Sequence, residues 1–359
     1  MVRARIALLC ILLLTSCGTP SAETPTSAQT SVPGERQVLR IFSWETYIDP
    51  ALLDQFAQEF NVEIVYDTFG SNEELYEKVV AGADYDVIVP SDYMVETMRR
   101  EGFLATIDQQ NIPNIKNIDP LFANPTYDPG LRYCLPYLWG TQGIGYNSAT
   151  VLEPIASLGD LFGPQTAGRV ALLDDPRATI GAVLIYLGYS PNTMDARQIA
   201  EARDFLKRHA PNMIFAKDDG QDRLLRGEVD YVFEWSGDML QAISENPDLR
   251  YIIPVEGSLV WTDNLCVLHS SPNKLLAEQF LNFILDPEVG AKLANYTHYS
   301  SPNAAALPMI NAEDRNNPAL YPNDLLRSRL FFLVDVGSDG NRLYQEAWEE
   351  ILALAKEAN

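Results

Sequence analysis

Aromatic, hydroxyl and acidic side chains gather at five places along this chain of 359 residues. The five groups are Trp44-Glu45-Thr46-Tyr47, Ser91-Asp92-Tyr93, Asp174-Asp175, Glu234-Trp235-Ser236-Gly237-Asp238 and Trp261-Thr262-Asp263. Carboxylates pair with ammonium groups, while aromatic faces cover methylene groups and attract cations by about 0.5–2 kcal/mol. The five groups contain no lysine or arginine, although Arg177 follows Asp175 by two residues. They predict a cavity for a flexible ligand that carries protonated amines.

The elements that position these groups alternate between strand and helix. Apolar runs predict strands at 38–43, 62–68, 86–89, 170–173 and 231–234. Amphipathic spacing predicts helices that include 50–60, 196–209, 275–285 and 342–356. Four of the groups follow a predicted strand, and the fifth precedes an apolar run at 264–268. Ligands of open α/β sheets bind beyond the carboxyl ends of strands, so the pattern predicts an α/β fold with a cleft there.

Each residue in these groups also has a structural explanation. Ser91, Asp92, Asp174 and Asp238 stand where helix N-caps stand, and capping alone would account for any one of them. Trp44 could fill the core at the end of its strand. The coincidence of all five groups, rather than any single residue, favours a ligand cavity.

The composition excludes several classes of function. The chain has 26 Lys+Arg against 49 Asp+Glu, a formal net charge of −23. Nucleic-acid binding needs a basic face, so we expect no nucleic-acid partner. The chain has three histidines, and it contains no C-x-x-C, H-E-x-x-H, EF-hand or G-x-S-x-G motif. We therefore predict neither a metal site nor a cofactor.

The N-terminus has the pattern of an export signal. Arg3 and Arg5 precede an apolar run at 6–14, which is too short to span a bilayer as a mature helix. The run ends at Leu14-Thr15-Ser16-Cys17, which resembles a bacterial lipobox. We predict a lipoprotein signal peptide at 1–16, lipid on Cys17 and a flexible tether at 17–37, which holds a periplasmic protein to a membrane by lipid alone. An ordinary signal peptide with an incidental cysteine is the alternative.

Two cysteines, Cys134 and Cys266, remain in the globular part of the chain. Export permits a disulfide between them. Each lies in an apolar, strand-like run, however, so two buried free thiols are an equally open alternative. The sequence does not decide between the two states.

Longer blocks of the chain resemble the spermidine/putrescine-binding proteins of bacterial ABC transporters. The resemblance extends from about residue 38 to residue 356. Its markers, besides the five groups, are Phe42-Ser43-Trp44, Val89-Pro90-Ser91, Leu135-Pro136-Tyr137-Leu138-Trp139-Gly140, Gly227-Glu228-Val229-Asp230 and Tyr299-Ser300-Ser301-Pro302-Asn303. It implies a type II periplasmic-binding fold, in which two lobes, each a mixed sheet flanked by helices, close on a ligand. It also implies delivery of the polyamine to permease subunits, with no catalysis, by a protein that we expect to be a monomer.

The resemblance assigns ligand residues by position. They are Trp44, Tyr47, Ser91, Tyr93, Asp175, Trp235, Trp261, Asp263 and Tyr299, with Asp238 as in putrescine-type members. We add Glu45, although spermidine-type members have a threonine there. This chain also has Ala178 and Leu333 where those members have glutamate and glutamine. These departures leave the choice of polyamine open.

Lobe one is predicted at 38–139 and 262–306, and lobe two at 140–261 and 307–359. The crossings near Gly140, Trp261 and Ala306 would form the hinge.

With carboxyl groups of ordinary pKa, polyamine binding should weaken below about pH 4.5. Two alternatives remain. One is a binding protein for another organic cation or an amino acid, and the other is a glycosidase that uses Asp174/Asp175 or Glu234/Asp238.

Overall fold

The computed structural model describes residues 36–45, 47–217 and 219–358. The chain divides into Met1–Arg36 and a compact unit, Gln37–Asn359, and the sheet, helices and cores all belong to the compact unit. The predicted signal peptide at 1–16, Cys17 and the predicted tether up to residue 35 lie outside the described residues. Within the described part of the chain, no helix has both the length and the apolar character needed to cross a membrane.

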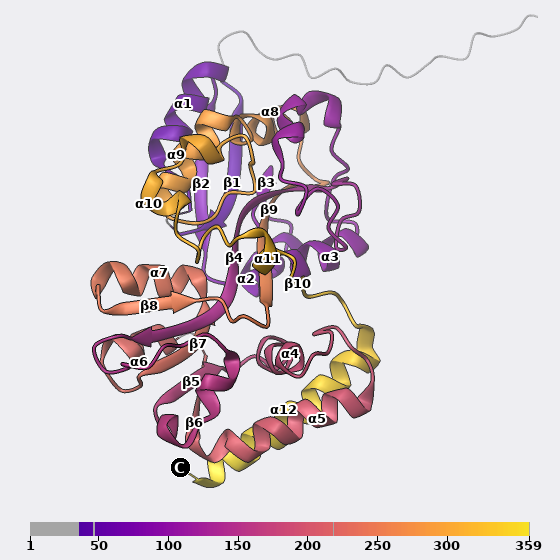
Figure 1. The fold of residues 1–359 in the computed structure, drawn as a ribbon. Coiled ribbons are helices and arrows are strands. Elements are labelled where there is room, and N and C mark those ends of the chain that lie inside the picture. The colour runs from indigo at the N-terminus through magenta and orange to yellow at the C-terminus, as the bar shows by residue number, and fades with distance from the viewer. Residues whose placement is uncertain (1–35, 46, 218, 359) are drawn as a thin grey trace, which may run out of the picture. The chain divides into compact units, whose positions relative to one another are not determined.

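A mixed sheet of ten strands runs through the described residues (Figure 1). The strands are β1 (Val38–Trp44), β2 (Glu63–Phe69), β3 (Val87–Ile88), β4 (Cys134–Asn147), β5 (Val170–Leu173), β6 (Met213–Ala216), β7 (Tyr231–Trp235), β8 (Leu249–Ile252), β9 (Ser258–Val267) and β10 (Leu330–Phe332). Their order is β2-β1-β3-β9-β4-β7-β5-β6, with β8 paired to β4 and β10 paired to β9. β1 is parallel to β2 and β3, whereas β4 is antiparallel to β7, β8 and β9.

Helices cover both faces of this sheet. They are α1 (Pro50–Phe60), α2 (Asn72–Val80), α3 (Asp92–Arg100), α4 (Pro176–Tyr186), α5 (Ala196–His209), α6 (Gly220–Leu225), α7 (Ser236–Glu245), α8 (Lys274–Ile284), α9 (Pro287–Thr297), α10 (Ala312–Arg315), α11 (Asp324–Arg327) and α12 (Gly337–Ala358). The predicted helices at 50–60 and 196–209 have the observed bounds. α12 begins earlier than the predicted 342, and α9 was not predicted.

β4 and β9 connect two regions of the sheet. The first region contains β1, β2 and β3 and continues through β9 to the first half of β4, which pairs with β9 as far as Thr141. The second region contains β5, β6, β7 and β8, and β4 joins it from Gln142 onward. Two predicted crossing points, Gly140 and Trp261, face each other in the β4–β9 register. A Cβ atom on Gly140 would lie 2.5 Å from the Trp261 ring, so this close approach requires glycine.

Each sheet region has apolar cores on both faces. In the first region, α1, α8 and α9 share one core with the sheet, and α2 and α3 share another. In the second region, α4, α5 and α12 cover one face, and α6 and α7 cover the other. Figure 1 shows α5 and α12 side by side, far along the unit from α1 and α8. This arrangement matches the predicted α/β architecture of mixed sheets flanked by helices.

The third crossing of the chain between the two sheet regions, predicted near Ala306, is a long segment and not a single hinge residue. Ala306, Leu307 and Ile310 pack together beside α9, and β10 then pairs with β9. Val336 is the point at which the chain joins the core shared by α5 and α12. The passage therefore extends from Ala306 to Val336, and the two lobe ranges stay a prediction.

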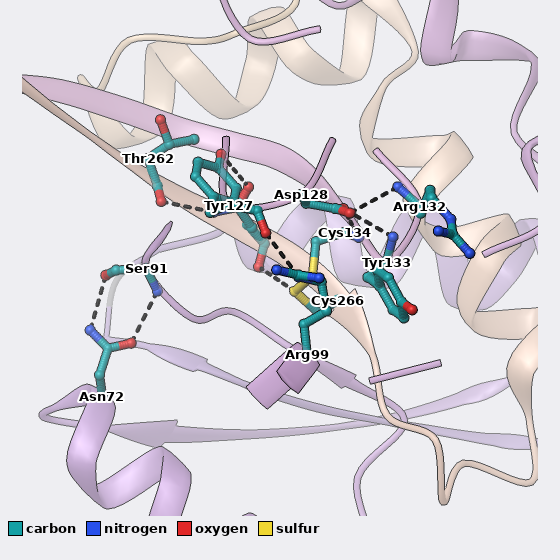
Figure 2. Close-up of a disulfide and its surroundings, with 11 residues drawn as sticks. Asn72, Ser91, Arg99, Tyr127, Asp128, Arg132, Tyr133, Cys134, Thr262 and Cys266 are labelled. Carbon is teal, nitrogen blue, oxygen red and sulfur yellow. Dashed lines mark hydrogen bonds between the residues drawn. A yellow bond between two sulfur atoms is a disulfide. The ribbon is translucent and has the colours of Figure 1, made fainter. Parts of the chain in front are cut away.

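The two cysteines of the globular part are joined by a disulfide (Figure 2). Cys134 and Cys266 are directly opposite each other in the β4–β9 register, with Cα atoms 4.3 Å apart. The bond links strands that are 132 residues apart in sequence, and it lies in the core shared by α2 and α3. Of the two states left open by the sequence, the structure has the disulfide.

Candidate functional site

The buried carboxyl group of Asp263 is the centre of the candidate site. Asp263 lies in β9 and is 5% exposed. The Tyr47 hydroxyl donates to its Oδ2 at 2.5 Å, and the Ser91 hydroxyl donates to its Oδ1 at 2.6 Å. Ser91 and Asp263 are also joined by an antiparallel bridge. Both hydroxyls are neutral, so they hold the carboxyl group in place without neutralising its charge.

Burial determines the electrostatics of this carboxyl group. Removal from water raises the pKa of Asp263 to about 6, and the hydrogen bonds from Ser91 and Tyr47 limit the rise. The carboxyl group is therefore largely ionised at neutral pH in a poorly solvated place. A cation nearby would relieve that cost.

Three aromatic rings lie around this carboxyl group. The ring centroids of Tyr47 and Tyr299 are 5.3 Å apart, and those of Trp261 and Tyr299 are 5.8 Å apart. Tyr299 follows α9, which ends at His298 in the left-handed conformation with φ of 56°. The unpredicted helix α9 is thus the element that brings Tyr299 to Tyr47.

Tyr299 connects the two sheet regions. It lies against Gly237 in the first turn of α7, where a Cβ atom would overlap the Tyr299 ring. Burial raises the pKa of the Tyr299 hydroxyl, and the charges of Asp238 and Asp263 raise it further. Asp238 from the second region and Asp263 from the first are therefore both close enough to Tyr299 to act on its charge.

A cavity of about 480 Å³ opens beside Asp92, which is close enough to Asp263 for the two charges to interact. The residues that surround the Asp263 carboxyl group, Tyr47, Ser91, Trp261 and Tyr299, are not among those that line this cavity. It is bounded by α3, the start of α4 and the segment from Leu333 to Asp335, so both sheet regions contribute to it. Two predicted site residues, Tyr93 and Asp175, line it. Its size is that of a small-molecule site.

Asp175 has both of the roles weighed from the sequence. Its Oδ1 accepts a hydrogen bond from the Ala178 amide at 2.8 Å and so caps α4, and its side chain also lines the cavity. Arg177 lines the cavity as well. The guanidinium group of Arg177 donates to Asn192 Oδ1 at 2.9 Å and lies 4.6 Å from the centre of the Tyr344 ring.

A second buried carboxyl group, that of Asp92, faces the same cavity. Burial raises the pKa of Asp92 to about 7, helped by the charge of Asp263, although the Tyr93 amide donates to Asp92 at 2.8 Å. The sequence placed Asp92 in the right group, but capping was the role predicted for it and it was not among the predicted ligand residues. A polar residue at the start of a helix carries no sequence signal that separates these roles.

Three other predicted site residues, Trp44, Trp235 and Glu45, are not among the residues that line the cavity. Trp44 donates from its indole N–H to the Val89 carbonyl at 3.0 Å, and its ring packs on Phe69 at 4.6 Å. Trp235 packs against a small core that includes Ala178. Glu45 is exposed in the turn after β1 and does not belong to the described residues that line the cavity.

The acids considered for hydrolysis have partners of their own. Asp174 accepts from the indole N–H of Trp348 at 3.0 Å, and Glu234 accepts from the Trp235 amide at 2.9 Å. Within residues 36–45, 47–217 and 219–358, no three histidine, cysteine, aspartate or glutamate side chains converge as metal ligands would.

Comparison with known proteins shows similarity over most of the chain. The family of bacterial extracellular solute-binding proteins matches residues 51–321. The spermidine/putrescine-binding periplasmic protein of Salmonella typhimurium is 34% identical over 323 residues, which cover 89% of this chain and 92% of that protein. The putrescine-binding periplasmic protein PotF of Escherichia coli is 32% identical over 343 residues, which cover 89% and 93%.

A solved structure confirms the fold. The spermidine/putrescine ABC transporter substrate-binding protein PotD of Streptococcus pneumoniae superimposes with a TM-score of 0.86 at 34% identity, covering 89% of this chain and 99% of that one. The predicted periplasmic-binding fold is therefore correct. The names of these relatives describe binding proteins, and that of the Streptococcus pneumoniae protein describes the substrate-binding protein of an ABC transporter, which sets the glycosidase alternative aside. The chain belongs to the family of bacterial extracellular solute-binding proteins.

Proposed function

We propose that this protein captures a polyamine, spermidine or putrescine, beside Asp263. The observation that carries the proposal is a buried carboxyl group held by the neutral hydroxyls of Tyr47 and Ser91 and surrounded by aromatic rings. A buried charge is costly without a partner, and a protonated amine supplies one. The names of the relatives state that those proteins bind spermidine or putrescine, which supports the same ligand class here.

The proposed roles of the residues follow from their places. Asp263 accepts a hydrogen bond from one ammonium group, and the rings of Tyr47, Trp261 and Tyr299 cover the methylenes. A second ammonium group lies toward Asp238 or toward the cavity. Tyr93 and Asp175 contribute from the wall of the cavity, and Trp44 and Trp235 support the site through packing. Glu45, which is exposed after β1, would reach a ligand only at the rim of the site.

We also propose how the protein works in its setting. The two lobes close on the polyamine, and the closed form delivers it to the permease subunits of an ABC transporter. The signal peptide at 1–16 is removed, and lipid on Cys17 holds a monomer at the membrane. Replacing Cys17 by alanine tests the anchor, because the wild type should incorporate a labelled fatty acid and the variant should not.

A specific observation favours a second ligand class. Among the described residues, the Arg177 Nε and Trp261 Nε1 groups are buried and lack a hydrogen-bond partner. Such donors suit an anionic acceptor, and Arg177 lines the cavity. An amino acid with its ammonium group at the far end, such as 4-aminobutyrate, would place ammonium at the carboxyl groups and its carboxylate at Arg177.

Isothermal titration calorimetry with a panel of ligands separates these classes. The panel is putrescine, spermidine, spermine, 4-aminobutyrate and a neutral disaccharide. Saturable heat with putrescine or spermidine, and none with the disaccharide, is the expected result. Binding of 4-aminobutyrate alone would replace the polyamine proposal by the second class. A thermal-shift assay supports the titration, since a ligand at a hundredfold excess over Kd stabilises the fold by about 2.7 kcal/mol.

A further inference from the structure

Ser91 stands at a helix N-cap without capping the helix. It precedes α3 directly, yet its hydroxyl makes no hydrogen bond to the first turn of that helix. N-cap serines usually accept such a bond. Here the hydroxyl donates to Asp263 Oδ1 at 2.6 Å instead. Capping would use the hydroxyl oxygen as an acceptor, and here an interaction with another donor occupies that oxygen.

That interaction comes from Asn72, the first residue of α2. The Asn72 Nδ2 group donates to Ser91 Oγ at 3.0 Å, and Asn72 Oδ1 accepts from the Ser91 amide at 3.0 Å (Figure 2). Asn72 is 5% exposed. Its own helix is capped by Ser71, which accepts from the Glu74 amide. The Asn72 side chain is thus not needed as a cap and is fully engaged with Ser91.

The two hydrogen bonds fix the orientation of both the Asn72 side-chain amide and the Ser91 hydroxyl. Only the carbonyl oxygen of the Asn72 side chain can accept from the Ser91 amide, so the NH₂ group must face Ser91 Oγ. A serine hydroxyl has one proton, and a donor that approaches the oxygen leaves that proton to point elsewhere. The acceptor that receives this proton is Asp263 Oδ1, 2.6 Å from Ser91 Oγ.

We propose that Asn72 is a positioning residue of the ligand site, because it directs the single hydroxyl proton of Ser91 onto Asp263. Asn72 does not touch the ligand. It keeps the Asp263 carboxylate ionised and fixed in orientation by securing one of its two donors. This inference rests on the proposed function, in which Asp263 accepts from an ammonium group.

A double-mutant cycle on the full chain tests the proposal. The variants are Asn72→Ala, Ser91→Ala and the double variant, each titrated with putrescine and spermidine by calorimetry. Loss of one hydrogen bond predicts a Kd about 3- to 10-fold higher for Asn72→Ala. If Asn72 acts through Ser91, the same change in the Ser91→Ala background raises Kd less than about twofold.

The pH dependence of polyamine binding provides a second test, because loss of a purely structural residue would leave the acid midpoint of binding unchanged. Loss of the directed donor should raise the pKa of Asp263, so the acid midpoint of polyamine binding should move upward in Asn72→Ala. Asn114→Ala is the matched control. Asn114 is a half-buried asparagine whose side chain also bridges to backbone, donating to the Asn282 carbonyl at 3.0 Å, away from Asp263. It should leave both Kd and the midpoint unchanged.

The outcomes are distinguishable. Additive effects of the two substitutions, or an unmoved acid midpoint in Asn72→Ala, would overturn the role of Asn72 while leaving polyamine binding intact. Absence of polyamine binding by the wild type would remove the proposed function and this inference with it. If Asn72→Ala does not fold, Asn72→Ser replaces it in the cycle, since serine is well accepted at the start of a helix and is too short to reach Ser91 in the same way.

Discussion

The ring of Tyr299, which follows α9, lies so close to Gly237 in the first turn of α7 that any side chain at position 237 would overlap it. This contact joins the two sheet regions at the candidate site. Tyr299 also contacts Tyr47 and Trp261, so the position of its ring determines how the aromatic surface near Asp263 is assembled.

Gly237→Ala should therefore weaken ligand binding while the fold is kept. The added methyl group displaces the Tyr299 ring, and overpacking of this kind costs about 1–3 kcal/mol, which predicts a Kd at least about fivefold higher for polyamine. Small-angle scattering should show less compaction on ligand addition than in the wild type. Gly181→Ala in α4 is the control, because its nearest neighbour would be 3.4 Å from the new Cβ atom. A Gly237→Ala variant with wild-type Kd would show that the Tyr299 contact is not used in binding.

Polyamine binding should lose affinity as the pH falls through the range from about 7 to about 6. Burial raises the pKa of Asp263 to about 6 and that of Asp92 to about 7, so both groups take up protons well above the pH of about 4.5 expected for ordinary carboxyl groups. A bound ammonium group favours the ionised carboxylates, so binding near pH 6.5 should release protons. Calorimetry in buffers of different ionisation enthalpy measures that release. A constant Kd between pH 7.5 and pH 5 would contradict the expectation.

The same shifts predict how the stability of the ligand-free protein depends on pH. The folded state holds these two protons at pH values where the unfolded chain, with carboxyl pKa near about 3.9, has released them. The free energy of unfolding should therefore fall as the pH rises from about 4 to about 7. Urea unfolding at several pH values measures this trend. In Asp263→Asn the fall should be smaller, because one of the two shifted groups is gone; an identical pH trend in the two proteins would argue against a shifted Asp263.

Removal of the disulfide should lower stability without changing the site. The bond between Cys134 and Cys266 closes a loop of 132 residues, and loops of this length correspond to a stabilisation of about 3–5 kcal/mol. The variant with both cysteines replaced by alanine should lose about that much in urea unfolding. Its polyamine Kd should stay within threefold of the wild type, because the pair lies in the core shared by α2 and α3. A loss below about 1 kcal/mol would show that the bond contributes little to stability.

Local sequence signals predicted some helices correctly, but they did not ensure that every helix with such signals was found. α1 has a cap at Asp49, a proline at its first position and a left-handed Asn61 at its end, and its bounds were predicted correctly. α9 has the same signals in Asp286 and Pro287 but was not predicted. The pairing of Cys134 with Cys266 was out of reach, because it depends on the register of two strands far apart in the chain.

The sequence predicted that the residues of the candidate site follow the ends of strands. It did not predict which of their side chains contact one another. Tyr47 and Asp263 are 216 residues apart, and only the assembled sheet shows that their side chains meet. Ser91 and Asp92 are both polar residues at the start of α3, where capping is the usual role. The partners of Ser91 lie in β9 and α2, and the Asp263 charge that acts on Asp92 also comes from β9. No local pattern at residues 91 and 92 records these neighbours.

The most direct test of polyamine capture at Asp263 is calorimetric titration of the wild type and Asp263→Asn with putrescine and spermidine at pH 7.5. Asn keeps the volume and removes the charge, and a charge-assisted hydrogen bond contributes about 1.5–3 kcal/mol, so Kd should rise about 10- to 150-fold with the fold intact. Asp86→Asn is the matched control. Asp86 is another buried aspartate held by a serine hydroxyl, that of Ser271, and by the Arg40 amide, so this variant should bind like the wild type. A folded Asp263→Asn protein whose Kd stays within threefold of the wild type would contradict the account.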